Sequence, residues 1–215
     1  MLRPENCNMS EITLKNIFKK APLASEYFRQ YSRYLLHLLA NLDFEIIENV
    51  ADLILAKAKE GRTVFLIGNG GSSTTASHFA TDLSHCGFIE HRPIIKAISL
   101  TENIAMLTAL GNDKGYDQIF ASQIKNLFQP EDILIAISAS GNSPNLIVAI
   151  KQAQKMGGHT IGLVGFNGGE LGKICDHVIQ VQTEQGEYGP VEDLHIILDH
   201  MLTSYLGIKL KNDRH

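Results

Sequence analysis

The sequence has few cysteines, no excess of positive charge and no long hydrophobic run, and each absence excludes a class of protein. The three cysteines, Cys7, Cys86 and Cys175, lie far apart and form neither a disulfide framework nor a Cys-x-x-Cys metal motif. The formal net charge of −4 shows no excess of basic residues of the kind that binds nucleic acid. No apolar run approaches the roughly 18 residues that span a bilayer, and the polar N-terminal residues lack the apolar core of a signal peptide. We therefore expect a soluble cytoplasmic protein with no nucleic-acid and no membrane partner.

The composition is typical of one sizeable globular domain with a smaller addition. Of the 215 residues, 44% are hydrophobic and 20% are charged. Apolar residues recur at helical spacing over residues 11–42 and again over residues 43–59, and Pro22 interrupts the first stretch. We expect residues 1–60 to form an N-terminal helical segment and residues 61–215 to form the main domain. The helical segment carries more apolar surface than one sheet face needs, so we expect it to join a bundle with other subunits.

Beyond the helical segment, short β-branched runs alternate with helical stretches. This alternation predicts an α/β fold, in which a five-stranded parallel sheet has helices on both faces. The predicted strands are Thr63–Ile67, Ile95–Ser99, Asp132–Ile137, Thr160–Val164 and His177–Val181. The predicted helices are about Ser73–His85, Glu102–Ala109, Ser143–Met156, Leu171–Ile174 and Val191–Leu206.

Two loops rich in glycine and serine, Gly68–Ser73 and Ser138–Ser143, each follow a predicted strand and lead into a helix. A helix start presents free backbone N–H groups, which bind anions such as phosphate. Because ligands bind at the carboxyl ends of parallel strands, we expect both loops to face one crevice. Each loop alone could be a plain tight turn, but two loops with this serine density favour a phosphate site. A nucleotide site is not indicated, because Ser73 breaks the G-x-G-x-x-G pattern and neither loop contains a lysine.

Two predicted helices carry residues that could bind a metal or transfer protons. His78 and Asp82 are four residues apart and share one helix face. Glu192 and His200 are eight residues apart, which is about 80° around the helix axis. Two histidines and two carboxylates suit zinc or a similar divalent ion. Each pair alone is weak evidence, because a histidine four residues from an aspartate is most often a surface pair.

His195 is an alternative to His200 as the functional histidine. It lies three residues after Glu192 and four before Asp199, so a structural carboxylate pair could hold it. The residues alone do not choose between the two histidines.

The order of these motifs resembles that of the sugar isomerase (SIS) domain family. The motifs are Gly68-Asn69-Gly70-Gly71-Ser72, His78-Phe79-Ala80, Asn112-Asp113, Ile137–Ser143 and Gly168-Gly169. The likeness runs from about Leu14 to Leu206 and is greatest to the phosphoheptose isomerase branch. That branch converts sedoheptulose 7-phosphate into glycero-manno-heptose 7-phosphates, an aldose–ketose isomerisation and so an intramolecular oxidoreduction. The resemblance implies a flavodoxin-like SIS fold and a homotetramer with sites at subunit boundaries.

The resemblance also implies a role for individual residues. The residues implied for the phosphate are Ser138, Ser140, Ser143 and, nearby, Ser72. Those implied for the rest of the substrate pocket are Asn69, Gly70, Gly71, Asn112, Asp113, Ala139 and Glu192. Those implied for one zinc ion per site are His78, Asp82, Glu192 and His200. Asp82 would act as the base and His200 as the acid in proton transfer through an enediol.

Three residues depart from the best-known pattern of the family. The family has glutamate at Asp82, glutamine at Glu192 and threonine at Ala139. An isomerase for another phosphosugar is therefore one alternative. A second alternative is a non-catalytic SIS-domain protein, either a phosphosugar sensor or a regulatory partner of the replication initiator. Such proteins can keep the Ser138–Ser143 loop, which we call the serine loop, while losing acid–base residues. The ionisable side chains retained in this chain therefore favour an enzyme.

Overall fold

The computed structural model describes residues 13–86 and 95–212, and the chain divides by its contacts into two units, Met1–Leu42 and Asp43–His215. The first unit contains helices α1 (Leu14–Lys20) and α2 (Ala24–Ala40). Pro22 lies between the two helices, as predicted, because a proline cannot donate to the helical hydrogen-bond ladder.

The second unit is built on a parallel sheet. Its strands are β1 (Thr63–Gly68), β2 (Lys96–Ser99), β3 (Ile133–Ser138), β4 (His159–Gly165) and β5 (His177–Val181), and their order is β2-β1-β3-β4-β5. The three inner strands are buried almost throughout, because helices cover both faces of the sheet. The predicted five-stranded α/β fold is confirmed, and each predicted strand end lies within one residue of the observed end.

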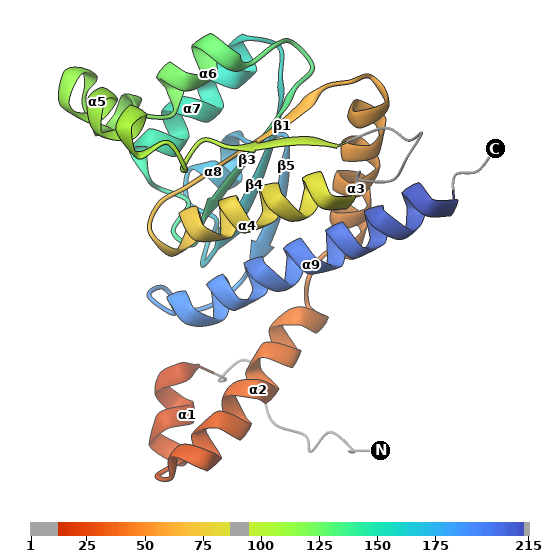
Figure 1. Cartoon of the computed structure of the whole chain (residues 1–215). Helices are drawn as coiled ribbons and strands as arrows, with labels where there is room; N and C mark the ends of the chain where they lie inside the picture. Colours follow the sequence, from red (N-terminus) through yellow and green to blue (C-terminus); the bar gives the residue numbers. More distant parts are fainter. Residues whose placement is uncertain (1–12, 87–94, 213–215) are drawn as a thin grey trace. The chain divides into compact units, whose positions relative to one another are not determined.

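Helices cover the sheet on two sides (Figure 1). Helices α3 (Phe44–Lys59), α4 (Gly71–Cys86) and α9 (Tyr188–Asn212) pack on one face. The other face carries α5 (Ile104–Lys114), the 3-10 helix η2 (Tyr116–Gln118), α6 (Ala121–Leu127), α7 (Pro144–Lys155) and α8 (Leu171–Ile174). The sequence did not predict η2 or α6. Within residues 13–86 and 95–212, no helix is both long and apolar enough to cross a membrane.

Helix α3 belongs to the second unit by its contacts. It packs against β1, β5 and α9, and Asp43 caps its first turn by accepting hydrogen bonds from the backbone N–H groups of Glu45 and Ile46. The role of residues 1–60 in an oligomer stays a prediction.

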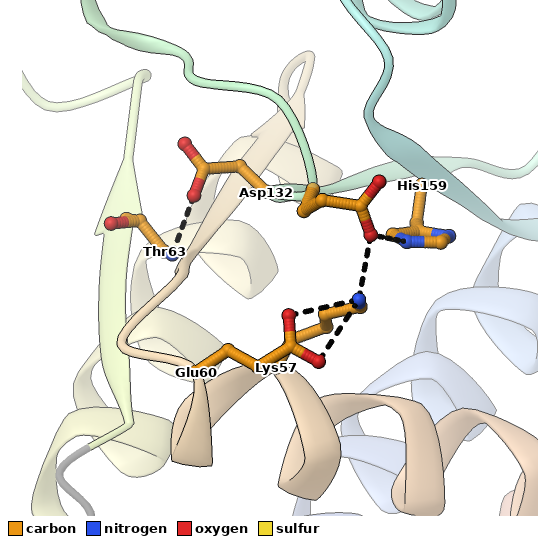
Figure 2. A network of polar contacts seen from close by, with 6 residues as sticks. Lys57, Glu60, Thr63, Asp132 and His159 are labelled. Atoms are coloured by element: carbon orange, nitrogen blue, oxygen red, sulfur yellow. Dashed lines mark hydrogen bonds and ion pairs between the residues drawn. The ribbon is translucent and has the colours of Figure 1, made fainter.

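A polar network joins α3 to the amino ends of β3 and β4 (Figure 2). The Nζ atom of Lys57 lies 2.7 Å from Glu131 Oε2 and 3.0 Å from Glu60 Oε2. Glu131 Oε2 is also 3.1 Å from His159 Nε2. The hydrogen bonds from Lys57 and His159 lower the pKa of Glu131 to about 2. This carboxylate therefore stays ionised and paired throughout the neutral pH range.

The stability of the amino edge of the sheet is predicted to depend on Asp132. This buried carboxylate accepts hydrogen bonds from the backbone N–H groups of Thr63 and Gln129, both at 2.8 Å. Asp132→Ala leaves both donors without their charged acceptor, so we expect the free energy of unfolding in urea to fall by about 3 kcal/mol. The matched change Glu60→Ala, at an exposed ion pair, should cost less than about 1 kcal/mol. Equal losses in the two variants would contradict this assignment.

Candidate functional site

The two glycine–serine loops lie side by side at the carboxyl ends of the neighbouring strands β1 and β3. Asn69 Nδ2 donates to Asn145 Oδ1 at 2.9 Å, and Asn145 Nδ2 donates to Asn69 Oδ1 at 2.8 Å. Tyr116 from η2 donates its hydroxyl to Asn69 Oδ1 at 3.1 Å. This reciprocal pair ties the first loop to the first turn of α7, and the expectation that both loops face one crevice stays a prediction. Sequence reasoning missed Asn145 and Tyr116, because an asparagine in a helix and a tyrosine after a glycine carry no distinctive signal.

The hydroxyl groups of the serine loop keep donor capacity for a ligand. Ser138 Oγ accepts a hydrogen bond from Gly141 N at 3.1 Å, and Ser140 Oγ accepts one from Asn142 N at 3.3 Å. Each of these hydroxyls can still donate its hydrogen. Ser143 occupies the N-cap of α7 with an extended backbone, yet its side chain makes no capping bond. Its hydroxyl is therefore available to an anion at this helix start.

The loop that contains Gly168 and Gly169 fixes the shape of the serine loop. Gly141 has φ +64°, and a Cβ there would collide with the carbonyl oxygen of Gly168. Gly169 has φ +57°, and a Cβ there would collide with the carbonyl oxygen of Ser140. The Gly168-Gly169 motif thus packs against the serine loop backbone at a distance that leaves no room for side chains.

The remaining predicted pocket residues fall into two groups. Ser72 and Ala139 are buried within the two loops, at 6% and 5% exposure. Asn112 and Asp113 are exposed near the end of α5, where Asn112 Nδ2 donates to Asp113 Oδ1 at 2.9 Å. Within the part of the chain that the structure describes, their side chains hydrogen-bond only to one another.

Helices α4 and α9 lie side by side and run in the same direction (Figure 1). At the start of both helices, the carboxylate of Glu192 faces Gly71, since a Cβ on Gly71 would stand 3.0 Å from Oε2 and 3.1 Å from Oε1. Glu192 therefore lies beside the Gly68–Ser73 loop (the first loop), among the residues predicted to contact the sugar.

About two turns further along, three of the four predicted metal positions meet. His78 Nε2 is 3.4 Å from Asp82 Oδ2 and 3.2 Å from His200 Nε2, and His200 Nε2 is 3.9 Å from Asp82 Oδ2. Glu192 is not a member of this group of mutually close ligand atoms.

Asp199 completes the group instead. One potential ligand atom from each of His78, Asp82, Asp199 and His200 lies within 4.8 Å of the others. Asp199 is fully buried, and neither carboxyl oxygen has a hydrogen-bond partner among the described residues. Burial, together with the negative charge of Asp82, raises the pKa of Asp199 to about 7.

The structure separates His195 from His200. His200 is exposed toward His78, whereas His195 is fully buried and lies outside the group. Burial lowers the pKa of His195 to about 4, so its ring is neutral at neutral pH. The histidine of α9 that faces His78 and Asp82 is therefore His200.

The donor set fits a divalent ion. Ligand atoms about 2.0–2.1 Å from a tetrahedral zinc stand roughly 3.4 Å apart, and the observed separations among His78, Asp82 and His200 are 3.2, 3.4 and 3.9 Å. The same carboxylate and imidazoles are also suitable as a base and an acid.

Comparison with known proteins gives consistent matches. Residues 26–165 match the model of the SIS domain. The chain is similar to the phosphoheptose isomerase of Nitratidesulfovibrio vulgaris, with 36% identity over 195 residues that cover 91% of this chain and 86% of that protein. The structure is similar to that of a phosphoheptose isomerase from Neisseria gonorrhoeae, with TM-score 0.75, 30% identity and coverage of 85% and 95% of the two chains. A phosphoheptose isomerase from Francisella tularensis matches with TM-score 0.74, 28% identity and coverage of 91% and 98%.

Proposed function

Because the chain belongs to the phosphoheptose isomerases of the SIS domain family, we propose that it converts sedoheptulose 7-phosphate into glycero-manno-heptose 7-phosphate through an enediol. The observation that carries this proposal is the meeting of His78 and Asp82, on the helix that begins at the Gly68–Ser73 loop, with His200 on α9. The enzyme is thus an aldose–ketose isomerase with a phosphosugar substrate.

The serine loop would hold the phosphate group. Ser138, Ser140 and Ser143 offer hydroxyl donors, and the start of α7 adds a favourable dipole. Asn69 from the Gly68–Ser73 loop and Glu192 from α9 would contact sugar hydroxyls, with Gly70, Gly71 and Ser72 beside them. Binding the phosphate remote from the reacting carbons contributes energy that positions C1 and C2.

Proton transfer would use Asp82 and His200. In the ketose-to-aldose direction, Asp82 would remove a proton from C1 while solvent donates one to the carbonyl oxygen O2, which gives the enediol. His200 would then deliver a proton to C2 while the hydroxyl on C1 gives its proton to solvent, which forms the aldehyde. Transfer of a proton from Asp82 to solvent and from solvent to His200 would restore both groups, so the cycle has no net change in protons. Both groups must come within about 3 Å of the atoms that they serve.

A divalent ion would be held by His78, Asp82 and His200, and we propose zinc, one ion per site. The ion would supply Lewis-acid polarisation of the carbonyl. His78 and His200 would each donate one ring nitrogen to it, which leaves the second ring nitrogen of His200 for proton delivery. Asp82 would offset its charge through one carboxylate oxygen, which leaves the other oxygen to accept the C1 proton.

We also propose a homotetramer. Four large apolar side chains in the first unit are between 64% and 72% exposed, and they are Phe18, Leu23, Phe28 and Leu36. Apolar side chains gathered in this way favour association with other subunits. A monomer in a sizing column at micromolar concentration would contradict the proposal.

The non-catalytic alternative needs only the phosphate loops. A phosphosugar sensor or a regulatory partner of the replication initiator would place no demand on the pairing of α4 with α9. The convergence of two histidines and a carboxylate from those helices favours the enzyme.

The test is isomerisation of sedoheptulose 7-phosphate by the purified protein, with a change at the phosphate loop. Ser143→Ala removes one hydroxyl donor to a charged phosphate, so we expect kcat/KM to fall about 10- to 100-fold. Most of this loss should come from a higher KM.

The control is Ser204→Ala, which removes an exposed hydroxyl on α9 that donates to Met201 O, and it should leave both constants unchanged. If the parent protein binds the sugar phosphate in calorimetry but turns none over, the isomerase proposal is wrong and the sensor alternative replaces it.

A further inference from the structure

Asp199 is a buried carboxyl group without a partner in the described part of the chain. It is fully buried within α9, and neither oxygen accepts a hydrogen bond there. Burying a carboxylate away from donors and cations is costly, and the cost is normally offset by a paired charge or a metal. Asp82 is the neighbouring charge that acts on Asp199, and it is negative, so it adds to the cost.

The unpartnered carboxyl points into the metal-binding group. An oxygen of Asp199 lies within 4.8 Å of the ligand atoms of His78, Asp82 and His200. Two aspartates and two neutral imidazoles carry a charge of −2 when both carboxylates are ionised, which balances a divalent cation. Without a cation, the same four side chains would leave two carboxylates uncompensated beside each other.

Glu192, the fourth position implied by family resemblance, occupies another place. Its carboxylate faces Gly71 at the first turn of α4. Eight residues of helix separate Glu192 from His200, a rise of about 12 Å along the axis. Asp199 directly precedes His200, so it reaches the group from the same turn of α9.

We propose that Asp199 is the fourth ligand of a divalent metal ion held with His78, Asp82 and His200, and that Glu192 serves the sugar. This inference rests on the metal site of the proposed function and names a ligand that the family pattern does not supply. Zinc is the ion to test, because two nitrogen and two oxygen donors suit it. Metal binding is measured without substrate, so its failure and the failure of the isomerase assay are distinct results.

The experiment measures the affinity of the metal-free protein for Zn²⁺ by competition with a chromophoric chelator. Asp199→Asn keeps the shape of the side chain and removes its charge, so we expect affinity to fall by at least about tenfold. The visible absorption of the Co²⁺-loaded protein should change in the same variant, because a ligand is lost. Glu192→Gln should bind Zn²⁺ as the parent does. Asp193→Asn, an exposed position on the same helix, controls for the loss of one negative charge.

Asp199→Leu provides a second variant in case the asparagine variant folds poorly. It replaces the buried acid with an apolar side chain, so the metal-free protein should melt no lower than the parent. Added Zn²⁺ should raise the melting temperature of the parent and not that of this variant.

Three results would overturn the proposal. They are parent-like Zn²⁺ affinity in Asp199→Asn, a larger loss in Glu192→Gln than in Asp199→Asn, and no Zn²⁺ binding by the parent. The last result would leave the isomerase function standing if the parent still turned over its substrate.

Discussion

The Asp82→Asn variant is expected to lose at least about 100-fold in kcat for isomerisation, because a positioned general base contributes about 10²- to 10⁴-fold. Asparagine keeps the size of the side chain but cannot accept the C1 proton. The loss should fall on kcat and leave KM nearly unchanged, since the phosphate is held elsewhere, by the serine loop. The direct readout is the exchange of C1 hydrogen with solvent deuterium, which should stop in the variant.

Two further variants test the assignment of the base and the acid. Asp82→Glu restores the residue typical of the family and should keep measurable turnover. His200→Asn should block isomerisation while Asp82 still exchanges the C1 proton. If Asp82→Asn exchanged that proton at the parental rate, the base would have to be assigned to another residue.

The second large effect concerns His195 and the pH dependence of stability. The pKa of this histidine is about 4 in the fold against an ordinary value of 6.5, because burial disfavours its charged form. Below pH 6.5 the unfolded chain binds a proton at His195 that the folded chain does not, so the contribution of His195 to stability is full above pH 6.5 and is lost as the pH drops toward 4. The loss from this residue is about 3 kcal/mol over that window.

The measurement is urea unfolding of the metal-free protein at a series of pH values. Asp199, with its pKa of about 7, contributes the opposite pH dependence in the parent and in His195→Leu alike, so the readout is the difference between their free energies of unfolding. That difference should shift by about 3 kcal/mol in favour of His195→Leu as the pH falls from 6.5 to 4. Leu198→Ala, on the same buried face, should lower stability by a similar amount at every pH and so controls for lost packing. A difference between parent and His195→Leu that stays constant over this window would contradict the assignment.

The strands were predictable because each buried strand is a short β-branched run bounded by turn residues. Helix α6 was missed, since the seven residues of Ala121–Leu127 are too few to show a helical period, and this helix forms against α7. The extent of α9 was underestimated at both ends. Tyr188 to Pro190 were assigned to the preceding polar loop, and the continuation of the apolar stripe from Leu206 to the buried Leu210 was missed.

In the candidate site, the sequence predicted which helices would meet but not the register between them. The angular separation of Glu192 and His200 suggested one shared face, while their axial separation places them at different turns of α4. Asp199 was not predicted as a ligand. The available signal was its position in the apolar stripe, between Leu198 and Leu202, where an acid is out of place unless it has a partner.

The amino-edge network around Lys57, Glu131 and Asp132 has a practical consequence for engineering the enzyme. Because all five strands are parallel, this network sits at the end of the sheet opposite to the loops that would bind the phosphosugar. Thermal tolerance can therefore be adjusted by redesigning charges at one end while turnover is screened at the other. A library built at the amino edge should yield variants whose melting temperatures vary widely and whose substrate profiles do not.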